Sequence, residues 1–486
     1  MPDFQFVGGS YEAPSIYQDA QECINWYCET DPTKQEGARG RTALYPTPGL
    51  VEVAQLQSGE VRGMRALSGE SILLVAAGNG VYTIDSAMTA VLVGTLNSNS
   101  GPVVITDNVM TSQGLTAYLV DGSARYIWVS ATSTFTELTS DGLWAAASSC
   151  DVVDNYVCYN QPGTQNWAVT DLGSPYSTTL FYGTKDSAPD NLQRVFVDHR
   201  QVYLFGDTTT EVWVDTGGGG PPIAFFPFER ISGTTMQHGI AGIHTAARFG
   251  DSIAFVSKDA RGQATVATLN GYQLVRISTH AVEHTLATAD LSSAIAYTYR
   301  QEGHEFYVLN VPSINVTWVY DLATQLWHKW LSYEDGAYQR HRSNCAAFFN
   351  GDNYVGDYEN GKVYRLDQAV YSDNGVAVRR LRRCPHLVTD LQRQYFDELQ
   401  IQFQPGVGLV SGQGSDPQAM LRWSNDGGST WSSEHWVSIG AIGQYRNRAI
   451  WRRLGMARDR VFEVVVSDPV YAAVISANLK ATEGAN

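Results

Sequence analysis

The sequence predicts an all-β fold, in which a β-propeller of six or seven blades is followed by an additional β-rich domain at the C-terminus. Three observations predict it. An aromatic-rich phrase of strand, tight turn and strand recurs along most of the chain. The 486 residues include 26 Tyr, 12 Trp and 45 Gly, which favours short strands and turns over helices. From Val376 onward the phrase gives way to strands of another pattern.

The recurrent phrase is clearest between Glu305 and Asp321, where two runs rich in Val, Tyr and Trp flank the turn-forming segment Pro312–Asn315. Its occurrences are roughly 40 to 50 residues apart, the period of a blade of about four strands. Since a single blade cannot bury both of its faces, we expect aromatic side chains to fill the layers between neighbouring blades. The seven occurrences are Ile72–Asp85, Ala117–Val129, Asn155–Asp171, Gln201–Asp215, Ser252–Ile277, Glu305–Asp321 and Asn353–Asp367.

Three regions follow from the positions of these phrases. Residues 1–56 do not resemble a blade, and we expect an N-terminal extension that either supplies a strand to close the ring or docks on another subunit. Residues 57–372 are predicted to form the propeller. Residues 373–486 are predicted to form the C-terminal β domain, a small sandwich or barrel.

One segment inside the propeller region interrupts the strand pattern. Gly217–Pro222 contains four consecutive glycines and two prolines, which no strand could cross. It leads to the Phe-rich segment Ile223–Phe228. This segment is either a contact surface or a loop folded back on the propeller.

The cysteines and the hydropathy indicate a soluble protein that is made without export. The six Cys are scattered and form no CxxC pair, so we expect buried, reduced thiols, although Cys23 and Cys28 are close enough in sequence to be bridged. No apolar run approaches the roughly 20 residues needed to span a membrane. The N-terminus lacks the basic start and apolar core of a signal peptide.

The formal net charge of −16 argues against general affinity for nucleic acid, because phosphate binding requires Lys and Arg. Basic residues nevertheless gather in the last quarter of the chain. They either bind an anionic partner, such as DNA or an acidic protein surface, or pair with Asp and Glu of neighbouring strands or subunits. The two groups are Arg379–Arg383 and the run Arg446, Arg448, Arg452, Arg453, Arg458 and Arg460.

The segment Ser424–Trp431 reads SNDGGSTW and fits the Asp-box pattern S-x-D-x-G-x-T-W. The Asp426 carboxylate and the Ser424 hydroxyl can bond to N–H groups of a turn, and glycines allow positive φ. The pattern predicts a hairpin geometry and says nothing about catalysis. The residues of this predicted hairpin are Ser424, Asp426, Gly428, Thr430 and Trp431.

Three strings resemble catalytic motifs without meeting their requirements. His280–His284 matches H-x-x-E-H, but the residues before it are β-prone and no third zinc ligand is positioned. Gly356–Lys362 matches G-x-x-x-x-G-K but ends in Val363, where a hydroxyl should reach magnesium. A sialidase would carry several Asp boxes, and only one is present. We therefore expect no catalytic residue and no metal site in these strings.

Several long strings resemble the packaged-DNA stabilisation protein of short-tailed phages, the tail hub or nozzle of podoviruses. The second His of His280–His284 is not part of that family's pattern. The likeness covers nearly the whole chain, from the N-terminal strings CINWY and LYPTPGL to the last strand. The strings that carry it are Cys23–Tyr27, Leu44–Leu50, Gly271–Glu283, Ala294–Pro312, Thr317–Trp330 and Leu421–Val470.

The resemblance implies a structural virion protein without enzymatic activity or cofactor. It implies a homohexamer in the virion tail, assembled in the host cytoplasm. The hexamer lies below the portal and its adaptor, closes the filled head, and forms a channel for DNA ejection that a tail needle, spike or fibre can plug. An acidic channel would let DNA slide without sequence-specific binding. We expect Arg446, Arg448, Arg452 and Arg453 to contact protein.

An alternative from another functional class is a tail adhesin whose propeller binds or cleaves glycans. A glycan-cleaving site would require two carboxyl groups about 5 to 9.5 Å apart in a cleft. The sequence contains many carboxylates but does not pair them.

Overall fold

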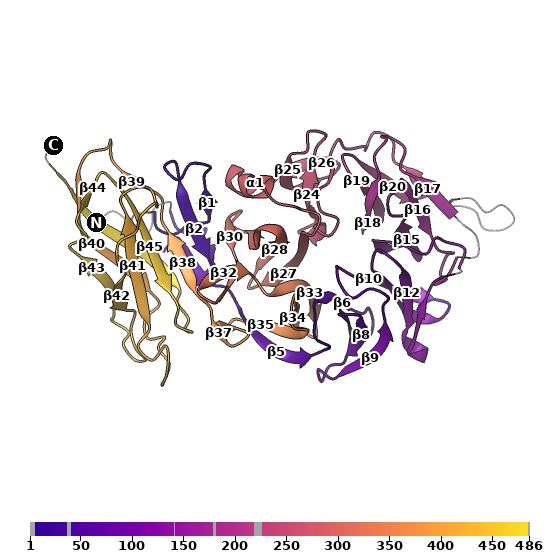
Figure 1. The fold of residues 1–486 in the computed structure, drawn as a ribbon, viewed down its shortest axis with the longest axis horizontal. Coiled ribbons are helices and arrows are strands. Elements are labelled where there is room, and N and C mark those ends of the chain that lie inside the picture. The colour runs from indigo at the N-terminus through magenta and orange to yellow at the C-terminus, as the bar shows by residue number, and fades with distance from the viewer. Residues whose placement is uncertain (1–4, 36–39, 140, 178–180, 218–225, 485–486) are drawn as a thin grey trace.

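The computed structural model describes residues 5–35, 40–139, 141–177, 181–217 and 226–484, arranged in an elongated molecule with two parts (Figure 1). A ring of seven antiparallel blades occupies the right of Figure 1, and a β-sandwich occupies the left, where both chain ends also lie. The predicted propeller with a C-terminal β domain is confirmed, and its blades number seven in the described residues.

The first four blades use consecutive strands, each paired antiparallel with the next. Blade 1 contains β6 (Val61–Ala66), β7 (Leu73–Ala77), β8 (Gly80–Ile84) and β9 (Ala90–Thr95). Blade 2 contains β10 (Val104–Thr111), β11 (Gly114–Val120), β12 (Arg125–Val129) and β13 (Thr134–Glu137). Blade 3 contains β14 (Cys150–Val153), β15 (Tyr156–Asn160), β16 (Asn166–Val169) and β17 (Phe181–Thr184). Blade 4 contains β18 (Leu192–Asp198), β19 (Gln201–Gly206), β20 (Thr210–Asp215) and β21 (Phe228–Arg230).

The last three blades complete the ring. Blade 5 contains β22 (Gly239–Ile240), β23 (Ala247–Phe249), β24 (Ser252–Lys258), β25 (Ala264–Asn270) and β26 (Gln273–Arg276), and α1 (His280–Ala287) follows it. Blade 6 contains β27 (Ile295–Gln301), β28 (His304–Val311), β29 (Val316–Asp321) and β30 (Trp327–Lys329). Blade 7 contains β33 (Ser343–Phe349), β34 (Asp352–Asp357), β35 (Lys362–Asp367) and the N-terminal strand β5 (Gly49–Gln55).

Each recurrent phrase of the sequence forms the second and third strands of one blade, and in blade 5 the phrase also includes the fourth strand. These strands are the most deeply buried of each sheet because neighbouring blades cover both of their faces. Trp128, Trp167 and Trp318 are almost fully buried between blades, as the aromatic composition predicts. The first strands of neighbouring blades contact one another around the ring, while the main strand contact between blades 4 and 5 is that of β19 with β22.

The strand β5 closes the ring from the N-terminal side of the chain. It pairs antiparallel with β35, from Lys362 opposite Gln55 to Asp367 opposite Gly49. Gly49 is required here because an added Cβ would lie 2.4 Å from the carbonyl oxygen of Val370. The outermost strand of blade 7 is therefore separated by about three hundred residues from the strand it pairs with.

The sandwich is built from both ends of the chain. One sheet contains β1 (Tyr11–Glu12), β2 (Ala20–Ile24), β38 (Arg380–Arg383), β39 (Leu387–Val388), β41 (Gln418–Ser424), β42 (His435–Ser438) and β45 (Asp459–Val466). The other contains β3 (Trp26–Thr30), β4 (Thr42–Pro46), β40 (Gln394–Phe403), β43 (Ala449–Arg452), β44 (Met456–Ala457) and β46 (Val474–Glu483). Nothing in the sequence of residues 1–56 predicts that most of this segment belongs to the sandwich. Two short hairpins lie near the junction, β31 (Leu331–Glu334) with β32 (Ala337–Arg340) and β36 (Ser372–Asp373) with β37 (Val376–Ala377).

The cysteines are all free thiols, and five of the six are buried, as their scattered spacing predicts. Cys23 and Cys28 lie in the sandwich core beside Trp26 and Leu44. Burial raises the pKa of the Cys23 thiol to about 12, so the thiol stays protonated and unreactive at neutral pH.

A continuous sheet joins the propeller to the sandwich. The last strand of blade 6, β30, pairs in parallel with β2, and β2 pairs antiparallel with β38. Beside this pairing, Lys329 lies 2.5 Å from Glu12 and 2.8 Å from Glu22. Burial alone would raise the pKa of Glu22, but the charges of Lys329 and Arg383 outweigh it and lower the pKa. These pairs fix how the two parts of the molecule meet.

The side chain of Asn25 holds the same junction from inside. It is fully buried between β2 and β3, with a left-handed φ of 58° that Asn tolerates better than most residues. Its Nδ2 donates to the carbonyl oxygens of Leu331 and Arg379, each at 2.8 Å. Its Oδ1 accepts from the backbone N–H of Leu331 at 2.8 Å. One side chain thus bonds to the segment leaving blade 6 and to the segment entering the sandwich.

We predict that Asn25→Asp destabilises the whole chain by roughly 2 to 5 kcal/mol, since the carboxylate leaves two buried carbonyl groups without a donor. Chemical denaturation followed by tryptophan fluorescence measures this. The matched control is Asn155→Asp, at another left-handed position where the side chain makes no hydrogen bond within the described residues. Equal stability of the two variants would contradict the role assigned to Asn25.

A second buried contact ties the N-terminal segment to blade 6. His304 bonds to Asp321 at 2.8 Å and to Glu29 of β3 at 2.5 Å. These hydrogen bonds raise the pKa of His304 to about 9. The charged imidazole therefore stabilises the folded chain through both the propeller and the sandwich.

Because the folded-state pKa of His304 lies above the ordinary value of 6.5, its stabilisation is complete below about pH 6.5 and is lost as the pH rises through about 9. We predict a decrease of up to about 3 kcal/mol in the free energy of unfolding over that window. Denaturation curves at a series of pH values measure it. The decrease should be smaller in His304→Gln and unchanged in the control His284→Gln, whose side chain is exposed.

Candidate functional site

The basic residues of the last quarter divide into a buried group and an exposed group. The buried group belongs to the architecture. Arg382 is fully buried and donates to the carbonyl oxygens of Phe6 and Gly9 at 2.6 and 2.8 Å. Arg383 pairs with Glu463 at 2.8 Å, and Arg460 donates to the carbonyl oxygen of Leu454 at 2.8 Å. These arginines stabilise neighbouring segments and are closed to a partner.

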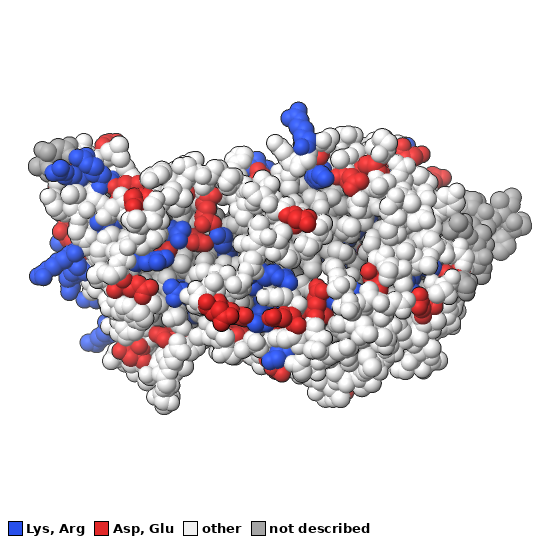
Figure 2. Space-filling view, in the orientation of Figure 1, with Lys and Arg blue, Asp and Glu red and all other residues white. Residues whose placement is uncertain are grey.

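Arg458 is exposed but donates to the carbonyl oxygen of Leu391 at 2.7 Å. Four further exposed arginines are the ones predicted to contact protein, and we name them the basic cluster: Arg446, Arg448, Arg452 and Arg453. It lies on β43 and the loops at its two ends. Arg452 pairs with Glu398 at 2.8 Å and is 66% exposed. Within the described part of the chain, Arg446, Arg448 and Arg453 form no ion pair, so their charges are open to a partner. In Figure 2, blue side chains project from the sandwich end of the molecule.

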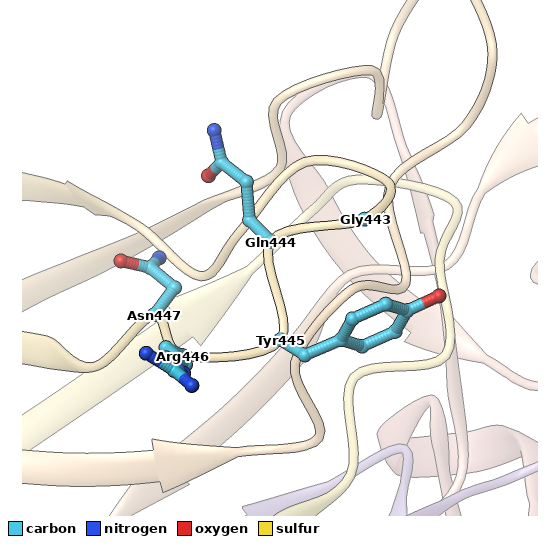
Figure 3. Close-up of a pocket in the computed structure, with 5 residues that line it drawn as sticks. All are labelled: Gly443, Gln444, Tyr445, Arg446 and Asn447. Atoms are coloured by element: carbon cyan, nitrogen blue, oxygen red, sulfur yellow. The ribbon is translucent and has the colours of Figure 1, made fainter.

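Two loops at the basic cluster expose the large side chains of Tyr445 and Val410 at what we call the loop tip. The loop Gly443–Asn447 lines a shallow pocket of about 490 Å³ (Figure 3). In Figure 3 the Tyr445 ring points away from Arg446, and the Tyr445 side chain is 71% exposed. A second loop packs against it, with an added Cβ at Gly406 lying 2.6 Å from the Tyr445 ring. This second loop exposes Val410 at 88%. Charged and apolar contacts are thus available side by side.

The Asp-box residues form a compact turn between β41 and β42. Asp426 accepts from the Thr430 hydroxyl at 2.6 Å and from the Thr430 N–H at 2.8 Å. The Gly428 N–H donates to Ser424 Oγ at 2.8 Å. Hydrogen bonds from Ser424 and Thr430 lower the pKa of Asp426 to about 2. Both carboxylate oxygens of Asp426 thus accept hydrogen bonds within the turn.

Trp431, the last residue of the Asp box, lies against the charged junction. Its ring stacks under two guanidinium groups, those of Arg422 at 4.7 Å and Arg383 at 5.1 Å. Both arginines also pair with Glu463, at 2.5 and 2.8 Å. The Asp-box hairpin therefore covers a buried ion-pair network, and its role is to support the structure of the sandwich.

The catalytic-looking strings occupy ordinary structural positions. His280–His284 begins α1, whose first turn is capped by Thr279. Glu283 pairs with Arg276 at 2.5 Å, and His280 is exposed. Among the residues that the structure describes, no three His, Cys, Asp or Glu side chains are grouped to hold a metal ion. Gly356–Lys362 forms the turn between β34 and β35, where a Cβ on Gly361 would lie 2.0 Å from the Gln57 carbonyl oxygen.

Most of the Gly-rich and Phe-rich segment, residues 218–225, lies outside the described residues. The part that is described packs on the propeller. The Phe226 ring lies 5.0 Å from Trp167 and 6.2 Å from Trp213. The Phe228 ring lies 5.6 Å from Tyr156. These two rings are therefore interior contacts of blades 3 and 4.

No helix of the described ranges is long and apolar enough to cross a bilayer.

The exposed end of the sandwich is the site where the sequence-predicted contact residues gather. Sequence reasoning located its arginines but not the neighbouring loop tip. The exposed Val410 and Tyr445 stand singly in loops that contain several glycines, so they give no periodic hydrophobic signal in the sequence.

Comparisons with known proteins agree with this architecture. Residues 28–371 match the family described as bacteriophage P22 Gp10, beta-propeller, and residues 379–482 match bacteriophage P22 Gp10, beta-sandwich. The tail hub protein gp10 of Salmonella phage P22 is 24% identical over 323 residues, which cover 64% of this chain. The chain spans 66% of that relative's length, just under two thirds.

Solved structures resemble the chain only loosely. The computationally designed Ika8 protein has a TM-score of 0.39 at 13% identity, covering 65% of this chain and 99% of its own. The extracellular domain of a hybrid two-component system from B. thetaiotaomicron has a TM-score of 0.44 at 8% identity, covering 80% of this chain and 47% of its own. Neither likeness informs on function. The first family match covers well over half of the residues and the second follows it in order, so the chain belongs to the bacteriophage P22 Gp10 family.

Proposed function

We propose that this protein is the tail hub, or nozzle, of a short-tailed phage, which closes the DNA-filled head below the portal-adaptor protein and forms a channel for DNA ejection. The observation that carries the proposal is the ordered match of both domains to one tail-protein family. The relative from phage P22 is a tail hub protein by name. The protein acts as a structural component of the virion tail and not as an enzyme.

A homohexamer is the assembly that suits this role. Six copies around one axis leave a channel, and a closed ring of blades leaves only short, protected sheet edges through which copies could aggregate. The continuous sheet through β30, β2 and β38 holds the propeller and sandwich of each copy together, so force on one is transmitted to the other. A tail needle, spike or fibre would close the far end, and DNA would pass without sequence-specific binding.

The basic cluster is the surface we assign to the portal-adaptor protein. The whole chain is acidic, with a formal net charge of −16, yet its C-terminal quarter has more basic than acidic residues. Three of the four cluster arginines have no carboxylate partner in the part of the chain described. An acidic patch on the adaptor, with an apolar recess for the loop tip, is the complementary surface.

The double charge reversal Arg452→Glu with Arg453→Glu should block attachment while leaving the monomer folded, because both side chains are exposed. DNA-filled heads that lack this protein are incubated with purified chain, and the DNA retained after nuclease treatment is measured. Wild-type chain should retain the DNA. The double variant should require a roughly tenfold or higher protein concentration to retain the same amount of DNA.

Arg261→Glu, an exposed charge reversal in blade 5, is the matched control and should retain DNA like the wild type. If the double variant also retains DNA at wild-type concentrations, the basic cluster is not the attachment surface. If wild-type chain fails to retain DNA, the hub role itself is wrong.

A further inference from the structure

A cleft of about 610 Å³ lies between blades 4 and 5, remote from the basic cluster. Three tight hairpin turns surround it: the β18–β19 turn, the β23–β24 turn and the β25–β26 turn. Blade 6 adds the exposed side chain of Leu322. The volume falls within the range of sites for small ligands. Nothing in the proposed hub role uses this cleft.

The floor of the cleft is apolar and its rim is polar. Phe249, Leu269 and Tyr203 are buried beneath it. Tyr272 stands at the rim with 38% of its surface exposed, so part of this residue is open to a ligand. The polar residues of the rim are Asp198, His199, Gln201, Asp251, Ser252, Thr268 and Asn270.

The aromatic side chain at the rim is held in place before any ligand arrives. Gln201 Nε2 of blade 4 donates to the Tyr272 hydroxyl of blade 5 at 2.9 Å. Gln201 in turn accepts from the Tyr203 hydroxyl at 3.3 Å. The two turns that carry His199 and Tyr272 are fixed by left-handed residues, His199 at φ 48° and Gly271 at φ 60°. A ligand would therefore meet an ordered ring at little entropic cost.

Several polar groups of the rim have unused hydrogen-bonding capacity. Across the ranges that the structure describes, the side chains of Asp251, Asn270 and Thr268 make no hydrogen bond. They offer a carboxylate, an amide and a hydroxyl, which together accept and donate. A ligand with several neighbouring hydroxyl groups satisfies all three.

The charges of the cleft select against other ligand classes. The Asp251 carboxylate, which forms no ion pair within the described residues, would repel a phosphate or another anion. The polar rim would be left unpaired by a purely apolar ligand, which costs free energy. A neutral saccharide has hydroxyl groups for the rim and an apolar ring face for Tyr272. We propose that this cleft binds a neutral saccharide, as part of a cell-surface polysaccharide.

The cleft is arranged for binding and not for cleavage. Glycoside hydrolysis uses a pair of carboxyl groups. Asp198 is already engaged, since it accepts from His199 Nδ1 at 2.7 Å and lies 3.9 Å from Arg248. Asp251 alone is free to act. The geometry thus supports the binding half of the adhesin alternative, and it is compatible with the hub role because the cleft lies on the propeller, whereas the basic cluster lies on the sandwich.

Saturation-transfer difference NMR tests the proposal with the full chain and a panel of neutral hexoses, 6-deoxyhexoses and their oligosaccharides at millimolar concentration. At least one should receive saturation, and its affinity should fall roughly tenfold in Tyr272→Ala, the factor expected for losing one ring contact. Asp251→Asn should weaken binding less, because the amide still offers one acceptor. Tyr272→Phe, which keeps the ring, should retain most of it.

Tyr17→Ala, which removes an exposed tyrosine of the sandwich, is the matched control and should bind like the wild type. Unchanged thermal unfolding of Tyr272→Ala shows that the cleft has not collapsed. Absence of saturation transfer to every sugar in the panel, or equal transfer in wild type and Tyr272→Ala, overturns the proposal. Neither result depends on whether the protein closes phage heads.

Discussion

The fold depends on one buried constraint, the hydrogen bonds of Asn25 to the chain on both sides of blade 7. Its Nδ2 reaches Leu331 and Arg379, residues that lie more than three hundred positions away in sequence. Because the strands on either side of Asn25 enter different sheets, this residue also fixes where β2 ends and β3 begins. The segment then continues to β5, which closes the ring. The N-terminal fifty residues therefore supply strands to both domains, and neither domain is complete without them.

Besides these hydrogen bonds, ion pairs at the junction fix the orientation of the propeller relative to the sandwich. Lys329, Glu22, Arg383 and Glu463 form a chain of ion pairs from blade 6 to the sandwich. Buried ion pairs contribute little net stability because desolvation opposes them, but a misplaced partner leaves an unpaired charge at a large cost. We infer that their main effect is to exclude other angles between propeller and sandwich. A building block with one fixed shape is what a symmetric ring requires.

The sequence predicts well what is local and repeated. Each blade follows from strands with tight turns between neighbours, and the Asp box follows because its bonds join residues at most four positions apart. The sequence leaves closure of the ring by residues 1–56 as one of two alternatives, and it does not predict the junction, since the partner strands are brought together only by the completed ring. The run Arg379–Arg383 could not be told from a surface patch. Arg380 and Arg382 alternate along β38, and both are buried there, which composition does not reveal. The cleft between blades 4 and 5 is likewise made by three separate turns.

The most direct test of the account is cryo-electron microscopy of DNA-filled heads to which the purified chain has been added. The account predicts a six-fold ring below the portal-adaptor protein, into which each propeller and sandwich fit together as one rigid unit. Heads that lose their DNA and show no ring at the portal vertex would contradict it. A ring that accepts the two domains only at a different mutual angle would contradict the rigid junction around Asn25.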